Sequence, residues 1–431
     1  SHIIAEVENS SLTASGNVTV STADHTTIYG VARDTSVAIS DSLSVGVAVP
    51  LAEQTVENTV QSTVASTSGA VSDIDVIALS GDIDVSVTSD AHVKTESTVW
   101  SAAGGIISVS VSSSTTDSSI SEQNILQASV NGQAGGHSLN LQAAQGSLNV
   151  QSQFDGHAES SIHSGSISVG IGGAVDTVSS TATNSPGVSA FIQGVTTVDT
   201  FGTVLVQADA EGHAQNESKQ TSVGLVFAGS GLNQNSIASP TVSAWIGDPQ
   251  STYEDQAQWR PSFETTVEGD EGITLRAQSF IDAATESQMI GGSIDITVLS
   301  PESHATVTPT VKVDVGPGTH LKSLNAIEIE AFGGLDQSPR PSTFDASRID
   351  DDENTIEYAD LHRLQTGNVV QYSKGVDNDL VPGLQSDKEY QVIVVTDKLV
   401  QLGSQIESSQ SSVDVDTDQL RFNSRVNFQQ P

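Results

Sequence analysis

The sequence predicts an all-β protein: a parallel β-solenoid (β-helix) followed by small antiparallel β modules in tandem. Three observations carry this prediction. A short segment with two apolar residues recurs six times within the first 334 residues, segments that alternate apolar with small or polar residues follow these recurrences, and no stretch favours a helix over extended chain. Alternation with period two is typical of strands, because successive side chains point to opposite faces. Strands that recur in a fixed order without helical crossovers stack as successive turns of a solenoid.

The recurring segment begins with GNVTV, and its six copies are spaced by 65, 65, 56, 69 and 54 residues. The unequal spacing predicts that loops of different length separate equivalent strands. We expect the apolar pairs of the six copies to form continuous columns in an aliphatic core of Val, Ile, Leu and Ala. These pairs are Val18/Val20, Ile83/Val85, Leu148/Val150, Val204/Val206, Ile273/Leu275 and Ile327/Ile329.

Two further elements recur. One alternates apolar with small or polar residues, and the other begins with a proline, which is tolerated at the first position of a strand because the missing N–H costs little there. The stretch Ala52 to Ser66 contains helix-favouring residues, but its Thr and Val content predicts extended chain. The alternating segments are 44–49, 106–111, 166–171, 222–227 and 293–298, and the prolines are Pro186, Pro240 and Pro309.

The number of residues in each turn of the solenoid has two possible values. A narrow coil of about 20 residues would place three turns in each repeat, whereas a wide, flattened coil would make the whole repeat one turn. The sequence shows no similarity at one third of the repeat. We therefore expect the wide coil.

Composition excludes several classes of protein. There are 53 Asp and Glu against 15 Lys and Arg, so 53 − 15 gives a net charge of −38. Nucleic acids and anionic lipid surfaces repel such a chain, and we expect no nucleic-acid partner. The absence of Cys excludes disulfides and thiolate metal sites. No apolar run of about 18 residues is present, so we expect no membrane insertion in this segment.

The carboxyl-terminal part is a different module. Residues 349–367 align without gaps on residues 413–431, so a tandem repeat of 64 residues begins at Ile349, and its second copy stops partway. This predicts that the chain is a piece of a longer protein. The expected organisation is a solenoid with about six repeats at 1–334, a linker at 335–348, a small β module at 349–412 and the start of a second copy at 413–431.

The repeats with V-x-A-x-I-G endings, as at Val242 to Gly247, and the pattern L-x-T-G-x-V-V-x-Y from Leu364 to Tyr372 support a resemblance. They resemble the giant bacterial surface proteins of the filamentous-haemagglutinin and leukotoxin-type filamentous adhesin families, which are repeat-containing β-solenoids. The resemblance implies a secreted or surface-displayed bacterial fibre. It implies no catalytic residues.

Three histidines hold equivalent positions, nine residues after the first apolar residue of their repeats: His92, His157 and His213. On a wide coil they would stack about 4.8 Å apart, and such a ladder could bind a transition metal. The alternative is that they are exposed turn residues copied by repeat duplication. Thr27 and Asp282 fill the same position in other repeats, which favours this alternative.

Aspartates crowd together near the start of each carboxyl-terminal copy. Carboxylate oxygens are suitable ligands for Ca²⁺, and crowded like charges favour a bound cation. The sequence therefore predicts calcium as a candidate cofactor, and no other. Neither segment is an EF-hand loop, and a merely solvated acidic run is the alternative. The aspartates are Asp350, Asp351, Asp352, Asp414, Asp416 and Asp418.

The insertion between Ile246 and Ile273 is rich in aromatic residues. Tyr253, Trp259 and Phe263 could stack on a sugar ring or contact another partner, or could cover an edge of the solenoid. A polysaccharide-active enzyme on a β-helix would need carboxylates and basic residues in a groove, and few basic residues are available. We expect the protein not to be an enzyme.

These observations together predict a structural fibre or adhesin that is extracellular or displayed on a bacterial cell surface. The expected partner is the protein itself, through head-to-tail or lateral self-association, with surface glycans or divalent cations as further partners. The alternatives are a monomeric adhesin that binds a glycan or receptor, and a polysaccharide-active enzyme on the same fold.

Overall fold

The computed structural model describes residues 2–132, 137–248 and 264–334, together with five strands further along the chain. The chain divides into two compact units, Ser1–Leu335 and Asp336–Pro431, and this division falls one residue beyond the expected end of the solenoid. The described residues form no helix, and hence no helix that could cross a membrane.

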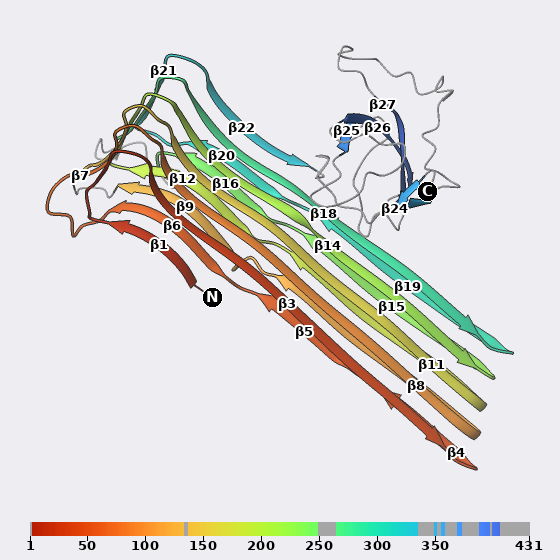
Figure 1. The fold of residues 1–431 in the computed structure, drawn as a ribbon. Coiled ribbons are helices and arrows are strands. Elements are labelled where there is room, and N and C mark those ends of the chain that lie inside the picture. Colours follow the sequence, from red (N-terminus) through yellow and green to blue (C-terminus); the bar gives the residue numbers. More distant parts are fainter. Residues whose placement is uncertain are drawn as a thin grey trace. The chain divides into compact units, whose positions relative to one another are not determined.

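Parallel pairing organises the first unit into three sheets, as the repeats predict (Figure 1). Sheet A contains β1 (His2–Glu8), β6 (Thr59–Ser66), β9 (Ile125–Gly132), β12 (Gly187–Gly194), β16 (Thr241–Ile246) and β20 (Thr310–Val315). Sheet B contains β2 (Leu12–Ala14), β7 (Ile74–Ala78), β10 (Leu139–Ala143), β13 (Thr196–Thr200), β17 (Thr265–Gly269) and β21 (Thr319–Ser323). Sheet C contains β3 (Val18–Ile39), β4 (Leu43–Ala48), β5 (Leu51–Val56), β8 (Ile83–Ile120), β11 (Leu148–Asn184), β14 (Thr203–Gly224), β15 (Phe227–Ala238), β18 (Gly272–Gly292), β19 (Ile296–Val307) and β22 (Ile327–Gly334).

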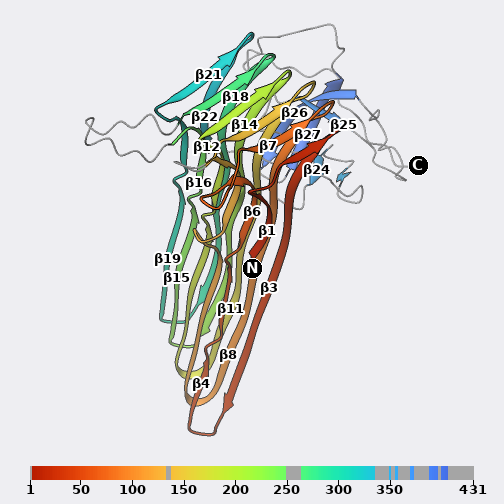
Figure 2. The same ribbon diagram turned by 90° about the vertical axis from the view of Figure 1, so that its left-hand side faces the viewer.

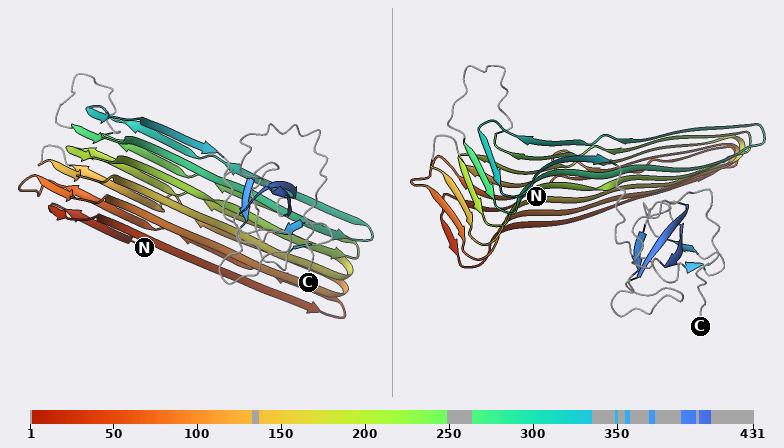
Figure 3. Two further views of the ribbon diagram at one scale, coloured as in Figure 1. Left: turned by 45° about the horizontal axis from the view of Figure 1, so that its top comes forward. Right: turned by 90° about the horizontal axis from the view of Figure 1, so that it is seen from above.

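One turn of the solenoid, or rung, consists of a long arm and a short head. The chain runs outward along sheet C, turns back at the far end, returns along sheet C, and then forms one strand of sheet A and one of sheet B (Figure 2). β8 makes the whole excursion and pairs along its length with β11 of the next rung. We call the two halves of each excursion the outgoing and returning layers of the arm. The successive rungs lie side by side in Figure 3.

The wide coil is therefore confirmed, because each rung is one sequence repeat. Ile83 pairs with Leu148, which lies 65 residues further on, and Leu148 pairs with Val204, which lies 56 residues further on. All six apolar pairs of the recurring segment stand in register across β3, β8, β11, β14, β18 and β22. Unequal repeat lengths leave this register intact because the extra residues lie elsewhere in the rung.

The head holds the aliphatic core. Sheets A and B and the base of sheet C each supply columns of fully buried side chains, which the period-two pattern places on the inner faces. Burial of one such Val, Leu or Ile contributes about 1.5–3 kcal/mol. The columns include Val64, Val130, Ile192 and Ile246 from sheet A, Leu141, Val198 and Val267 from sheet B, and Val85, Val150 and Val206 from sheet C.

The interior of the arm is largely polar, contrary to the expectation of an aliphatic stack throughout, and its buried apolar residues form only two small clusters, around Ala158 and around Ile162. Ser and Thr hydroxyl groups meet across the two layers: Ser97 Oγ lies 2.6 Å from Ser114 Oγ, and Ser160 Oγ lies 2.7 Å from Ser180 Oγ. All four side chains are buried. Small side chains let the two layers approach closely, and the hydroxyls satisfy one another because each can donate and accept.

The alternating segments all lie at the far end of the arm, but they are not all equivalent. Residues 166–168 pair with residues 222–224 in the outgoing layer. Residues 44–48 pair with residues 108–112 in the returning layer. The strands on both sides of the turn alternate apolar with small or polar residues, so segments from the outgoing and the returning layer share one sequence pattern.

The three prolines precede the strands that they were expected to open. Pro186, Pro240 and Pro309 come directly before β12, β16 and β20, and the Thr241 N–H donates to the Pro186 carbonyl oxygen of the preceding rung (2.9 Å). Ala52 to Ser66 is extended as expected, in β5 and β6, apart from the two residues that join these strands.

The second unit contains an antiparallel sheet, as predicted for the carboxyl-terminal module. Its order is β23-β24-β27-β26-β25. The rest of that unit, including residues 413–431, lies outside the described residues. The strands are β23 (Ile349–Asp350), β24 (Thr355–Glu357), β25 (Val369–Tyr372), β26 (Lys388–Thr396) and β27 (Leu399–Gln405).

Candidate functional site

A column of imidazoles crosses three rungs on the outer face of the outgoing layer. His157 of β11 pairs with His92 of β8 and with His213 of β14. Thr27 and Asp282 occupy the same column in the rungs on either side. The predicted stacking is thus confirmed, and it follows from the in-register pairing of strands that carry histidine at the same position.

The rings contact one another edge to face. The ring centroids of His157 and His213 are 4.3 Å apart with an interplanar angle of 77°, and those of His92 and His157 are 5.7 Å apart at 69°. The Nδ1 atoms of His157 and His213 are 2.7 Å apart, a hydrogen bond in which one ring donates and the other accepts. A ring that accepts at Nδ1 is neutral, so this contact requires at least one of the two imidazoles to be unprotonated.

Burial selects the neutral ring. It lowers the pKa of His213, although the nearby Glu159 carboxylate opposes the shift. For His92 the order of effects is reversed: its interaction with Glu159 raises the pKa, and burial opposes. The pKa values of His92 and His213, at the two ends of the column, are therefore shifted in opposite directions.

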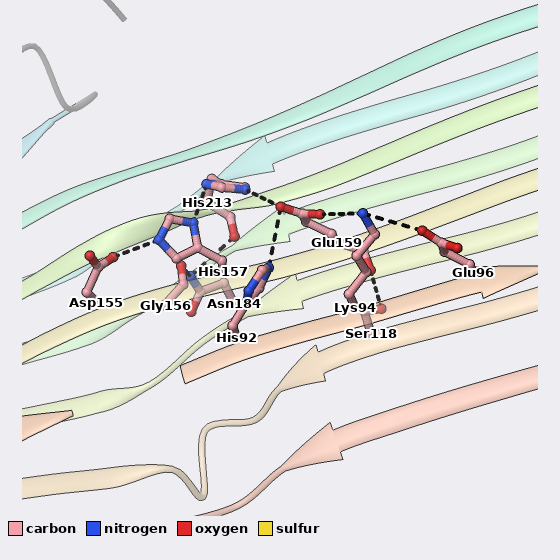
Figure 4. A network of polar contacts seen from close by, with 10 residues as sticks. All are labelled: His92, Lys94, Glu96, Ser118, Asp155, Gly156, His157, Glu159, Asn184 and His213. Carbon is pink, nitrogen blue, oxygen red and sulfur yellow. Dashed lines mark hydrogen bonds and ion pairs between the residues drawn. The ribbon is translucent and has the colours of Figure 1, made fainter. Parts of the chain in front are cut away.

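Glu159 joins the column to a neighbouring row of charges. Its Oε1 atom lies 3.4 Å from Nε2 of His213 and 3.5 Å from Nε2 of His92, and its Oε2 atom lies 3.4 Å from Nζ of Lys94 (Figure 4). Lys94 also lies 3.4 Å from Glu96. The two histidines lower the pKa of the Glu159 carboxyl most, burial opposes them, and Lys94 adds to the lowering, so this carboxylate is ionised.

The arrangement can bind and release protons, and it neutralises most of its own charge. His157 Nε2 lies 3.0 Å from Asp155, which gives the central ring an acidic neighbour as well. Among the residues that the structure describes, no three His, Cys, Asp or Glu side chains are arranged to hold a metal ion. Metal binding by His92, His157 and His213 thus stays a prediction, and the geometry on its own shows a column of hydrogen-bonded imidazoles beside the Glu159 carboxylate.

The other predicted site residues lie mostly outside the described residues. Of the six aspartates proposed for calcium, the structure places only the backbone of Asp350, which pairs with Thr355 in the antiparallel sheet. The remaining five, and the aromatic residues Tyr253, Trp259 and Phe263, are not among the described residues. Both sites stay predictions.

Sequence reasoning missed the role of Lys94 and a buried carboxylate in the arm. Lys94 and Glu159 are 65 residues apart, so the repeat spacing would have placed them side by side once the wide coil was known. Asp176 is fully buried between the arm layers and accepts hydrogen bonds from Ser112 (2.7 Å) and Ser164 (2.6 Å). No signal along the chain identifies Asp176, because its Ser164 partner comes from the opposite layer.

No protein-family model, curated protein or solved structure matches the chain. The fold and the imidazole column are therefore interpreted from their own geometry.

Proposed function

We propose that the chain is part of a structural fibre or adhesin, extracellular or displayed on a bacterial cell surface, that associates with copies of itself. The observation that carries this proposal is the continuous in-register stacking of rungs, in which each rung pairs along its whole length with its neighbours. Such a stack resists bending, because any bend must break many ladder hydrogen bonds together. The resemblance to filamentous adhesins supports the same conclusion.

The proposed mechanism is mechanical and interfacial. The carboxyl-terminal end of the stack presents β19, β20, β21 and β22, and no described strand pairs with their outer edges. Open strand edges pair readily with strands of another chain, so they offer a route to end-to-end association. The net charge of −38 separates neighbouring fibres, and divalent cations would bridge them.

Electron microscopy of the purified whole chain, with and without a calcium chelator at constant ionic strength, tests this proposal. We expect regular filaments that fray when Ca²⁺ is removed. Filaments that are unchanged by the chelator would support the fibre and overturn bridging by calcium. Isolated particles in both conditions would overturn self-association and favour a monomeric adhesin that binds a glycan or receptor.

A further inference from the structure

Exposed aliphatic side chains gather where the arm turns back. We call these segments the apolar tips: residues 37–49, 100–111, 165–175, 221–229 and 290–298, one from each of five rungs. In a chain of net charge −38, the only charged residues of the apolar tips are Asp41 and Asp295. Both lie in the outermost rungs, so the three middle tips carry no charge.

The alternation of the strands makes both outer faces of the tips apolar. In β8, Ser108, Ser110 and Ser112 are fully buried between the layers, so Ile107, Val109 and Val111 point outward. On the returning face three apolar columns run across the rungs, and on the outgoing face a further column does so. The returning columns are Leu43–Ile107–Ile171, Val45–Val109–Gly173–Phe227–Ile296 and Val47–Val111–Val175–Gly229–Val298, and the outgoing column is Val37–Ala102–Ile167–Val223.

Two aromatic rings cover glycines of the apolar tips: Trp100 covers Gly165 of the adjacent rung, and Phe227 covers Gly173 of the adjacent rung and Gly229 of its own strand. A Cβ on Gly165 would meet the Trp100 ring at 2.2 Å, and a Cβ on Gly173 or Gly229 would meet the Phe227 ring at 3.0 Å. The rings therefore lie across the positions without side chains. The apolar surface is continuous on both faces.

The backbone of the turns is paired between rungs. The Ile107 N–H donates to Ser42 (2.8 Å), the Ser40 N–H to Gly104 (3.0 Å), and the Ile296 N–H to Val226 (3.1 Å). Removing water from the tips leaves these groups satisfied. This lowers the cost of burying them in an interface.

We propose that the apolar tips are the lateral contact between copies of this chain, with the tip of one copy packed face to face on the tip of another. The proposal rests on the proposed self-association and names its surface. Two acidic copies repel each other everywhere except where charge is missing, and the tips are such a region. A basic or nucleic-acid partner finds no charged group to bind on the three middle tips.

Size and spacing favour a second copy as the occupant. The half-exposed aliphatic residues of the returning face together offer roughly 700 Å² of apolar surface, close to the ~800 Å² that each partner contributes to a standard interface. Two copies present side chains at the same spacing from rung to rung, so their rows interdigitate. Because each tip is apolar on two faces, it can lie between two other tips, and the contact propagates instead of closing at a dimer.

Charge substitutions on one face at a time test the proposal in the whole chain. Ile107→Glu with Ile171→Glu alters the returning face, and Val37→Glu with Ile167→Glu alters the outgoing face. Thr115→Glu with Ser179→Glu is the matched control, because it adds the same charge to the returning face of the same strands, away from the tip. Sedimentation velocity gives the mass of the assemblies, and circular dichroism checks that each variant is folded.

We expect the natural sequence and the control to form large assemblies in which copies also lie side by side. Each one-face variant should associate laterally only in pairs, and the variant altered on both faces should lose lateral association while keeping the end-to-end association of the proposed fibre. Assemblies of unchanged mass in the two-face variant would overturn the tip contact, and filaments seen by microscopy in that variant would leave the proposed fibre intact. A natural sequence that is monomeric would overturn both proposals. Flotation of that monomer with neutral phosphatidylcholine vesicles, lost in the two-face variant, would identify lipid as the occupant and overturn a second copy.

Discussion

Gly194, the last residue of β12, occupies a position that tolerates no side chain. Its φ of 76° lies in the left-handed region, and a Cβ would lie 1.4 Å from the carbonyl oxygen of Gly132 in the preceding rung. We expect Gly194→Ala to lower the free energy of unfolding by about 3 kcal/mol, from backbone strain and a forced shift of the β9–β12 contact.

Gly231→Ala is the matched control for this substitution. Gly231 has no positive φ, and its Cβ would make an ordinary contact with Thr177 at 3.7 Å. Thermal unfolding of both variants beside the natural sequence measures the difference. Equal melting temperatures for the two variants would contradict the close approach of the rungs at Gly194.

Asp209 makes stability depend on pH. Burial raises its pKa from 3.8 to about 6, although a hydrogen bond from Gln207 Nε2 (2.5 Å) lowers it. Between about pH 4 and pH 6, the Asp209 carboxyl therefore keeps its proton in the folded chain and has lost it in the unfolded chain. The stabilisation is complete below about pH 4 and is lost as the pH rises through about 6.

Asp209→Asn, which cannot ionise, should therefore stabilise the protein by about 1–2 kcal/mol at pH 8 and leave it nearly unchanged at pH 4. Melting temperatures at the two pH values measure the effect. Asp199→Asn removes a charge from an exposed position in the preceding rung, and so controls for the change in net charge. A gain of the same size in both variants at pH 8 would attribute the effect to net charge alone.

At the scale of the element, the arm depends on small side chains between its layers. Ser97 and Ser114 approach within 2.6 Å, so no larger side chain fits between them without separating the layers. We expect Ser97→Leu to destabilise the arm by about 2 kcal/mol through overpacking. Ser97→Ala with Ser114→Ala should be close to neutral, because both hydrogen-bond partners are removed together.

Hydrogen exchange followed by mass spectrometry measures this effect within the arm, and the head serves as an internal reference. Faster exchange in β8 of the leucine variant, with unchanged exchange in sheets A and B, is the expected result. Equal protection in the leucine and double-alanine variants would show that the layers are not closely packed at this point.

The strands and their repeat order were predictable from period two and from the recurring apolar pairs. Which side chains of the two arm layers face each other was not predictable. Period two shows that alternate residues share a face, but it does not say which face is inside, and Ser and Val alternate equally well with either face inward. The outward valines of the apolar tips, such as Val109 and Val111, therefore resembled core residues.

At the scale of the whole molecule, the excess of 53 acidic over 15 basic residues places like charges close together along the stacked rungs. Folding brings these charges nearer to one another than they lie in the unfolded chain, so screening should stabilise the fold. We expect the melting temperature to rise by a few degrees between low salt and about 0.15 M NaCl, where the Debye length is about 8 Å. A melting temperature that falls with salt would indicate that local ion pairs such as Lys94–Glu159 outweigh the overall repulsion.

The class of fold, the wide rung and the stacking of His92, His157 and His213 are predictable from the amino-acid sequence, because each of these depends on residues that repeat at a regular spacing along the chain. The contacts across a rung, Ser97 with Ser114 and Asp176 with Ser164, are known only from the folded structure. Pairing between rungs repeats the sequence period, whereas pairing across the arm depends on where the chain turns back, and no period of the sequence encodes that point.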